Sequence, residues 1–355
     1  MQRLTHSHKE NSAIIISSRI RLARNLAGRR FVQAMGSRQL NEVYTVCAAA
    51  LCKIKKLRGY TLYDMGALTD FDREILAENR IISKELGDAD KGRGAYVSRG
   101  GGVSVFINEE DHIRIQAIDF GLELDALYKK ADAIDDEIEE RLEYAYSDDI
   151  GYITSCPTNM GTGMRASVMM HLPALSASMQ IDKITRALNQ LGMVVRGANG
   201  EGSDSVNAFF QLSNQQTLGV SEDEIIQKIK TYCKKICQFE IDARYKALED
   251  DPLAVFDKFL RARATLENCK LIDSEEAVAN LSVLRLAADM NFMGSSGGVV
   301  EKIDELSTDV LPCHLQNLFD ESAVSERRDV LRARYLNEAV AELPPINTKS
   351  IKHLL

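Results

Sequence analysis

Alternating apolar and polar positions mark two strand regions in the first 120 residues. Residues 13 to 20 read AIIISSRI, a β-branched run that predicts a strand, and basic side chains crowd its end. From 103 to 107 apolar residues alternate with polar ones, the acidic stretch NEED follows, and the alternation resumes at Ile113. This pattern predicts two strands joined by a tight acidic turn.

Apolar residues at helical spacing predict four helices between residues 39 and 248, over 39–57, 119–145, 171–191 and 222–248. Two further strands are expected at 193–197 and 208–214. The segment GANGEGSDS lies between these strands and consists of glycines and small polar residues. Because neither a helix nor a packed strand favours that composition, we expect a mobile loop over 197–205.

Strand patterns nearly disappear after Asp251, where the dipeptide Asp-Pro predicts a break. Helical patterns follow at 275–290 and 326–343. The sequence therefore predicts two domains, residues 1–251 and 252–355. The first lacks the regular strand-helix-strand order of a parallel sheet, so we expect an α+β fold with a mainly antiparallel sheet flanked by helices. The second is expected to be an all-helical C-terminal domain.

Composition sets limits on the class of protein. With 355 residues, of which 45% are hydrophobic, the chain is long enough for two domains. Its net charge of −8 does not favour a general nucleic-acid or membrane-surface role. Seven scattered cysteines form no disulfide framework, and Cys233 and Cys237 lack the second pair that a zinc site requires. No apolar run approaches the roughly 18 residues of a membrane span, so we expect a cytoplasmic protein without a metal site, membrane segment or nucleic-acid partner.

Five arginines stand at strand ends or beside glycines. They come from four separated segments: Arg19, Arg21, Arg114, Arg165 and Arg196. Guanidinium groups chelate phosphate oxygens through paired N–H donors, and a triphosphate carries enough charge to require several of them. Any single one could belong to an ordinary surface ion pair, but the set favours a polyphosphate site.

Carboxylates in two segments suit a basic acceptor. Glu109, Glu110 and Asp111 lie in the turn between two predicted strands, and Glu201 lies in the glycine-rich loop. A run of acids at a turn is commonly only solvated. A guanidinium acceptor, however, stays protonated in water, and two carboxylates at its edges could hold it in plane and take up its proton. Arginines and magnesium would then offset the charge of a transferred phosphoryl group.

The string GTGMRA, within residues 161 to 166, allows a different interpretation. A Gly-x-Gly-x-x-Ala string can form the phosphate-binding turn of a nicotinamide enzyme, provided that it ends a buried strand, opens a helix and precedes an acidic residue by about 20 positions. Here the preceding strand is thin, and the next acidic residue, Asp182, falls inside a predicted helix. The match is partial, and a lone glycine string is a weak signal.

Four segments resemble the signature segments of the phosphagen (guanidino) kinases, in the same order along the chain: SSRIRLARN, INEEDHIRI, SCPTNMGTGMRAS and VVRGANGEGS. The CPTN stretch resembles that family's reactive-cysteine signature. Their order and spacing extend the resemblance over residues 13 to 250. On this interpretation GTGMRA is the phosphate-facing segment that follows the family cysteine.

The resemblance implies roles for individual residues. The five arginines match the nucleotide-phosphate arginines, and Arg80 stands where family members often place a histidine against the adenine. Glu110 matches the catalytic carboxylate, Glu201 the second carboxylate on a closing loop, and Cys156 the cysteine beside the guanidinium. A packing role alone stays open for Cys156. ATP and Mg²⁺ are the implied cofactors.

The arrangement of domains indicates a subfamily. Small-molecule phosphagen kinases carry a helical domain of about a hundred residues before the SSRIR-like strand. Here that strand begins at residue 13, and a helical stretch follows the catalytic part instead. This arrangement is similar to the bacterial protein-arginine kinases of the superfamily. A guanidine site without that covering domain would suit an arginine presented on a polypeptide.

The helical tail contains RDVLRA at residues 328–333, which matches the motif with which such kinases bind phosphoarginine at a regulatory site. On a helix, Arg328 and Arg332 would lie one turn apart, with Asp329 adjacent. An exposed helix with a routine charge pattern is the alternative.

The hypothesis from the sequence is an ATP-dependent protein-arginine kinase. The resemblance also implies a role in protein quality control and stress response, with substrates marked for a Clp-type protease. Implied partners are proteins with accessible arginines, a zinc-binding activator protein and a Clp ATPase, and the helical tail would form a homodimer. The alternatives are a kinase for free arginine or another small guanidino compound, and a non-catalytic phosphoarginine-binding scaffold.

Overall fold

The computed structural model describes residues 14–88, 91–197, 205, 207–294, 298–319 and 325–349, without the side chains of 325 and 326. The chain divides into two compact units. The first comprises Met1–Met170, Ala187–Val195 and Gln211–Lys234, and the second comprises His171–Arg186, Arg196–Phe210 and Lys235–Leu355.

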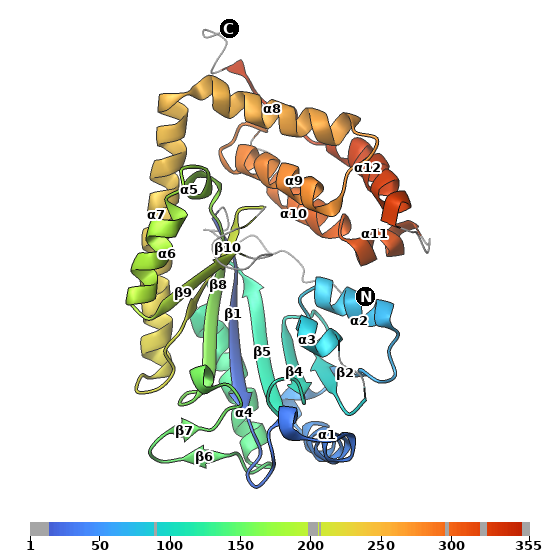
Figure 1. The fold of residues 1–355 in the computed structure, drawn as a ribbon, viewed down its shortest axis with the longest axis vertical. Coiled ribbons are helices and arrows are strands. Elements are labelled where there is room, and N and C mark those ends of the chain that lie inside the picture. The colour runs from blue at the N-terminus through green and yellow to red at the C-terminus, as the bar shows by residue number, and fades with distance from the viewer. Residues whose placement is uncertain are drawn as a thin grey trace. The chain divides into compact units, whose positions relative to one another are not determined.

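Eight strands form one sheet in the order β2-β3-β4-β5-β1-β8-β10-β9 (Figure 1). The strands are β1 (Ile15–Arg24), β2 (Thr61–Asp64), β3 (Gly94–Val97), β4 (Val103–Ile107), β5 (Ile113–Phe120), β8 (Met164–His171), β9 (Met193–Gly197) and β10 (Phe209–Asn214). β1 pairs antiparallel with β5 and β8, and β2 to β5 form an antiparallel meander. A separate hairpin joins β6 (Tyr146–Ser147) and β7 (Gly151–Tyr152). The predicted α+β class and the predicted acidic hairpin, β4 to β5, are confirmed.

The two faces of β1 differ in chemistry because successive side chains point to opposite sides of a strand. Ile20 and Leu22 are buried on one face. Arg24 shares that face and reaches Asp135 of helix α4 (Leu124–Glu139), with Nη2 2.6 Å from Oδ2. Helix α4 therefore covers the apolar face of β1, behind the sheet in Figure 1. Arg19 and Arg21 project from the other face.

The register of β1 with its neighbours places further arginines beside these two. Arg21 lies directly opposite Arg165 of β8, and Ala23 lies opposite Arg114 of β5. Directly opposed residues in antiparallel strands point to the same side of the sheet. Four arginines from three adjacent strands thus share one face.

The described chain also contains helices on both sides of Asp251. They are α1 (Ser37–Leu51), α2 (Asp70–Glu78), α3 (Lys84–Gly87), α5 (Pro173–Ala177), α6 (Ile181–Gln190), α7 (Glu222–Asp250), α8 (Pro252–Asn268), α9 (Ser274–Asp289), α10 (Val299–Asp309), α11 (Pro312–Phe319) and α12 (Ser325–Ala341), with short 3₁₀ turns at Val32–Ala34, Lys55–Leu57 and Pro157–Asn159. Within the second unit, helices α8, α9, α10 and α12 share one apolar core around Phe256, Leu281 and Leu336. No helix of the described chain is both long enough and apolar enough to cross a membrane.

The predicted break at Asp251 is the junction between two helices, and Asp251 caps the start of the second one. Helix α7 ends at Asp250, and the Asp251 side chain accepts a hydrogen bond from the backbone N–H of Ala254, with Pro252 in the first turn of α8. Capping by aspartate and proline at the first helical position favour this local geometry. The domain boundary predicted between 251 and 252 stays a prediction.

Several predicted elements differ from the observed ones. The single helix expected over 171–191 is two helices, α5 and α6, because Met179 adopts a left-handed conformation with φ of 54° between them. The helix expected over 39–57 ends at Leu51. Strands β2 and β3 were not predicted, since each has only four residues and all four residues of β3 are buried, which removes the alternation.

We expect Asp135→Ala to destabilise the fold strongly. Arg24 is 3% exposed, donates from both Nε and Nη2 to Asp135, and stacks 3.5 Å from the centre of the Tyr152 ring. Loss of the carboxylate leaves this guanidinium buried without its counter-charge, which costs about 3–5 kcal/mol. Urea unfolding followed by circular dichroism measures the difference. The control is Asp136→Ala on the same helix, whose exposed side chain should change stability by about 0.5 kcal/mol or less; equal effects would contradict this assignment.

Candidate active site

A pocket opens on the arginine face of the sheet within the first unit. It encloses about 330 Å³ of empty space, including its open mouth. Its lining comprises Arg21, Ala23, Glu110, Asp111, Arg114, Asn159, Gly163 and Arg165. Four sequence-predicted site residues therefore meet here: Arg21, Glu110, Arg114 and Arg165.

Two arginines of this face donate hydrogen bonds to neutral side chains, and a third has a buried donor. Arg19 donates from Nη2 to the side-chain oxygen of Gln211 at 3.0 Å, and Arg165 donates from Nη2 to Ser213 at 3.3 Å. The Nε atom of Arg21 is buried and has no hydrogen-bond partner among the described residues. A buried donor without an acceptor is costly, so this side of the pocket is built to receive one.

Burial and mutual repulsion lower the pKa of two of these guanidinium groups. Burial and the charges of Arg114, Arg80 and Arg165 lower the pKa of Arg19 to about 9. Burial, followed by Arg19 and Arg114, lowers the pKa of Arg21 well below its ordinary value. Guanidinium groups stay protonated in proteins, so these shifts express a raised free energy of the charged cluster, which a bound polyanion would lower.

Glu109 neutralises part of the positive charge of the cluster by pairing with Arg114. It is 6% exposed and accepts hydrogen bonds from Arg114 Nη1 at both oxygens and from the hydroxyl of Ser83. Burial alone would raise the pKa of Glu109, but Arg114 and the hydrogen bonds outweigh it and hold the pKa below its ordinary value. Glu109 is therefore an ionised structural partner of Arg114.

Glu110, the next residue, behaves differently. Its carboxylate lines the pocket and makes no hydrogen bond or ion pair with any residue that the structure describes. Burial, followed by the negative charge of Asp111, raises the pKa of Glu110, although Arg114 opposes the shift. A half-buried, unengaged carboxylate with a raised pKa is suited to accept a proton.

Asp111 fixes the turn that presents Glu110. Its Oδ1 accepts hydrogen bonds from the Asn25 amide and from the backbone N–H of Ser155, each at 2.6 Å. His112 is fully buried, and its Nδ1 accepts from the backbone N–H of Leu26 while Nε2 donates to the Arg30 carbonyl. These bonds hold the NEED turn to the end of β1 and to the segment SCPTN.

The glycines of GTGMRA are required by close backbone packing. Gly163 has φ of 63°, and a Cβ there would lie 2.4 Å from Arg24 Nη1 and 2.6 Å from the Ala23 carbonyl oxygen. The segment leads into strand β8 at Met164, whereas a dinucleotide-binding turn leaves a strand and opens a helix. The nicotinamide interpretation of this string is therefore wrong.

Comparison with known proteins identifies the family. The family model of the ATP:guanido phosphotransferase C-terminal catalytic domain matches residues 42–243, and that of the protein-arginine kinase McsB C-terminal domain matches residues 252–351. The protein-arginine kinase of Shouchella clausii is 40% identical, over 92% of this chain and 91% of its own. That of Clostridium tetani is 39% identical, over 94% of this chain and 97% of its own.

The chain belongs to the protein-arginine kinase family. It is therefore an enzyme, a phosphotransferase of the ATP:guanido type. Solved structures agree with this fold. Lombricine kinase superimposes with a TM-score of 0.57 at 26% identity, over 68% of this chain and 69% of its own. The substrate-free duplicated taurocyamine kinase of Schistosoma mansoni gives 0.57 and 26% over 68% of this chain and 36% of its own. The predicted family and fold class are confirmed.

Besides Arg19, four predicted catalytic or nucleotide-binding residues of this protein-arginine kinase are not among the residues that line the pocket. Cys156 is half-buried, and its Sγ lies 3.0 Å from the Thr158 hydroxyl. Arg80 is exposed, in a left-handed conformation with φ of 58°, and its charge contributes to the low pKa of Arg19. Arg196 belongs to the second unit and is exposed. Glu201 lies outside the described residues. The roles of these four residues stay predictions.

The predicted phosphoarginine residues lie on α12. Arg332 is 2% exposed and donates to the carbonyls of Val310 and Ile272 and, at 2.5 Å, to Asp329. Arg328 is half-buried. Arg332 thus joins three segments of the helical region, and the binding role of these residues stays a prediction.

Sequence reasoning missed Asn159 and Arg24 as parts of this site or its support, and it missed the pairing of Glu109 with Arg114. Glu109 and Glu110 are adjacent and alike, so only the fold shows which one pairs with Arg114. The alternation along β1 could have identified Arg24. It stands an even number of residues from Ile20 and Leu22, so its side chain belongs to the same buried face.

We expect Gly163→Ala to lower stability by several times more than Gly28→Ala. Both glycines have nearly the same φ, 63° and 68°, but a methyl group at Gly28 would meet nothing within 4 Å, whereas one at Gly163 would meet Arg24 and a backbone carbonyl. A left-handed backbone costs alanine about 1–2 kcal/mol at either position. The additional loss of stability in Gly163→Ala therefore measures the clash of the new methyl group with its neighbours. Thermal unfolding of the two variants tests this; similar losses would show that the contact adds nothing.

Proposed function

We propose that this chain transfers the γ-phosphoryl group of Mg-ATP to arginine side chains of proteins. The observation that carries the proposal is the pocket of the first unit, in which the unengaged carboxylate of Glu110 shares a cavity with Arg21, Arg114 and Arg165. The family membership and the matches to protein-arginine kinases support the choice of acceptor.

The arginine face fits a triphosphate. Arg21 has a buried Nε donor that lacks an acceptor among the described residues, and the cluster carries more positive charge than Glu109 offsets. Phosphate oxygens would accept from these donors and lower the free energy of the cluster. Arg19 and Arg165 would help from their positions beside Gln211 and Ser213. Arg80 would also belong to the proposed nucleotide site, and the family resemblance implies the same role for Arg196.

Mg²⁺ would enter with the nucleotide. The described residues contain no group of three or more His, Cys, Asp or Glu side chains that could hold a metal ion. Mg²⁺ commonly takes most of its ligands from substrate phosphates and water. When bound, the ion neutralises charge on the phosphate oxygens.

Glu110 would act as the proton acceptor. A guanidinium nitrogen forms a bond to the γ-phosphorus while the bond from that phosphorus to the bridging oxygen of ADP breaks. The nitrogen's proton passes to Glu110, whose raised pKa makes it a better base than an ordinary glutamate. Glu201 is the proposed second carboxylate, and Cys156 is proposed to lie beside the guanidinium.

The biological setting is proposed from the family resemblance. Phosphoarginine would mark proteins for a Clp-type protease, with a zinc-binding activator protein and a Clp ATPase as partners, in the cytoplasm of a bacterial cell under stress. The helical tail would form a homodimer, and Arg328, Asp329 and Arg332 would bind phosphoarginine there. Because Nε and Nη1 of Arg332 are already engaged, Arg328 would be the more accessible phosphate ligand of the two.

Incubation with Mg-ATP and casein should produce acid-labile phosphate on arginine side chains, detected by mass spectrometry under neutral conditions. Glu110→Gln should lower turnover by about 10²–10⁴-fold, because it removes the proton acceptor, and should leave ATP affinity nearly unchanged. The matched control is Glu140→Gln, an exposed glutamate of the same unit, which should keep full activity. Phosphorylation of free arginine with none on casein would instead support a small-molecule guanidino kinase.

The pKa of Glu110 should determine where activity falls on the acid side of the pH–activity profile. As a base, Glu110 is active above its pKa, and activity falls as pH drops through that pKa. Since Asp111 raises the pKa of Glu110, Asp111→Asn should shift the acid limb of kcat/KM to lower pH, while the retained Oδ1 still accepts from Ser155. Stopped assays across the pH range measure the shift. An unmoved limb would show that another group titrates.

A further inference from the structure

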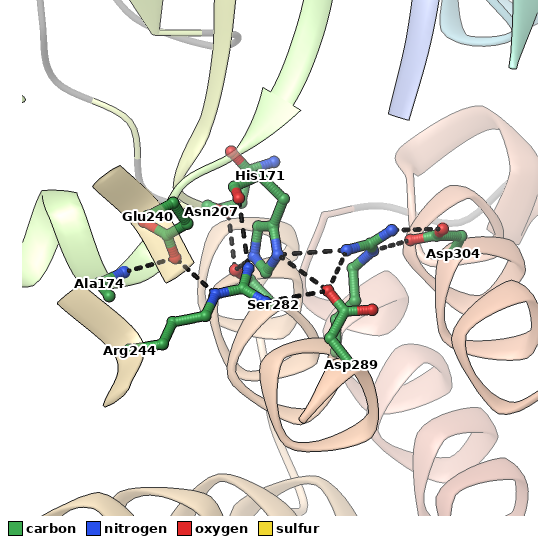
Figure 2. Close-up of polar contacts among 9 residues, drawn as sticks. His171, Ala174, Asn207, Glu240, Arg244, Ser282, Asp289 and Asp304 are labelled. Carbon is green, nitrogen blue, oxygen red and sulfur yellow. Dashed lines mark hydrogen bonds and ion pairs between the residues drawn. The ribbon is translucent and has the colours of Figure 1, made fainter. Parts of the chain in front are cut away.

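A buried polar cluster in the second unit serves no assigned role. Its ionisable and hydroxyl side chains come from β8, α7, α9 and α10 and comprise His171, Glu240, Arg244, Ser282, Arg285, Asp289 and Asp304 (Figure 2). His171 and Glu240 are fully buried, and Arg285 is 2% exposed. Asp289 accepts from Arg285 at 2.8 Å, and Arg285 also donates to Asp304 at 2.8 Å.

Stability alone is a weak reason for such a cluster. Removing several charges from water costs free energy, and apolar side chains of similar volume often serve stability as well or better. Burial raises the pKa of Asp289 to about 6 even though Arg285 and Arg244 oppose it. What a fully satisfied network does provide is a unique geometry for the backbone that it holds.

The hydrogen bonds of the cluster have a fixed direction. The Ser282 hydroxyl donates to the carbonyl of Asn207 at 2.7 Å, which uses its only proton. The 2.8 Å contact between Ser282 and His171 must therefore be donated by Nε2–H of the imidazole. Nδ1 is then free to accept from Arg285 Nη1 at 3.3 Å. Burial, followed by Arg285 and Arg244, lowers the pKa of His171 far below its ordinary value, which agrees with a neutral ring.

The backbone segment that Ser282 holds at Asn207 continues into strand β10, which carries acceptors for two arginines of the proposed active site. Asn207 follows the sequence segment that contains Glu201 and stands two residues before β10. The next residue, Ala208, has φ of 54° and accepts from the Leu172 backbone N–H at 2.9 Å. Further along β10, Gln211 and Ser213 accept the hydrogen bonds of Arg19 and Arg165. Strand β10 therefore begins two residues after the carbonyl that Ser282 holds and carries both acceptors further along its length.

We propose that Ser282 is a positioning residue for phosphoryl transfer, fixing the backbone at Asn207 and thereby the start of β10, and that His171 and Arg285 orient its hydroxyl for this task. The inference rests on the proposed function, because it gives the arginines that β10 supports a role in that reaction. It assigns the helix α9 a part in the chemistry without contact with substrate.

Ser282→Ala tests the proposal directly. We expect kcat for casein phosphorylation to fall by about 10- to 100-fold, the scale of a small misplacement of reacting groups. Hydrogen exchange of the amides over 208–214 should become faster at the same time. Ser282→Thr keeps the hydroxyl and should restore most of both. Ser307→Ala is the matched control, because Ser307 on α10 donates only to Ile303 of its own helix, and it should retain the wild-type kcat.

A second pair of variants separates orientation from folding. In His171→Gln the amide nitrogen can take the place of Nε2 and donate to Ser282, whereas the shorter amide of His171→Asn reaches only the place of Nδ1. The proposal expects a higher kcat for His171→Gln at similar melting temperatures. A wild-type kcat in Ser282→Ala, an equal loss in Ser307→Ala, or unchanged exchange over 208–214 would overturn it. If the wild-type chain phosphorylates no arginine, the proposed function fails, while the exchange measurement still decides whether Ser282 fixes β10.

Discussion

Repulsion among like charges on one face of the sheet is the constraint around which the first unit is organised. The antiparallel register of β1 with β5 and β8 brings Arg21, Arg114 and Arg165 to one side. Glu109 balances part of this charge through Arg114, and Gln211 and Ser213 offer neutral acceptors. The remaining excess is tolerated because β1 is anchored on its other face, where Arg24 and Asp135 hold helix α4. Arg24 thus fixes β1 on one face, while Arg19 and Arg21 on its other face can bind an anion.

In the first unit, hydrogen-bond and ion-pair partners separate the side chains that stabilise the fold from those proposed to act in the reaction. Arg24 has a carboxylate, a carbonyl and an aromatic ring, whereas Arg21 retains a buried donor without an acceptor among the described residues. The three acids of the NEED turn separate in the same way: Glu109 is paired, Asp111 is bound to backbone and amide groups, and Glu110 is unengaged within the described chain. Residue type alone cannot make this distinction, because it depends on which neighbours the fold supplies.

Sequence patterns predicted the structure correctly where it depends on neighbouring residues along the chain, and they predicted the family where the motif is long. The alternation over 103–117 predicted the β4 to β5 hairpin, and the glycine and arginine segments predicted the family. The four-residue strand β3 could not be predicted, because burial on both faces removes its period. The division of the 171–191 helix depends on a left-handed Met179, which no local preference of that residue indicates. The cluster around His171 was missed because its members are spread from residue 171 to residue 304 and meet only in three dimensions.

The hairpin that carries Glu110 also carries Arg114, four residues later at the start of β5. The hydrogen bonds of Asp111 and His112 fix the backbone of this short turn, and so the backbone positions of these two residues relative to each other. The proposed proton acceptor and a proposed phosphate ligand would therefore travel as one body during any opening or closing of the enzyme. A change in an element that approaches this hairpin from outside would then alter which acceptor is admitted without altering the backbone spacing of these two groups.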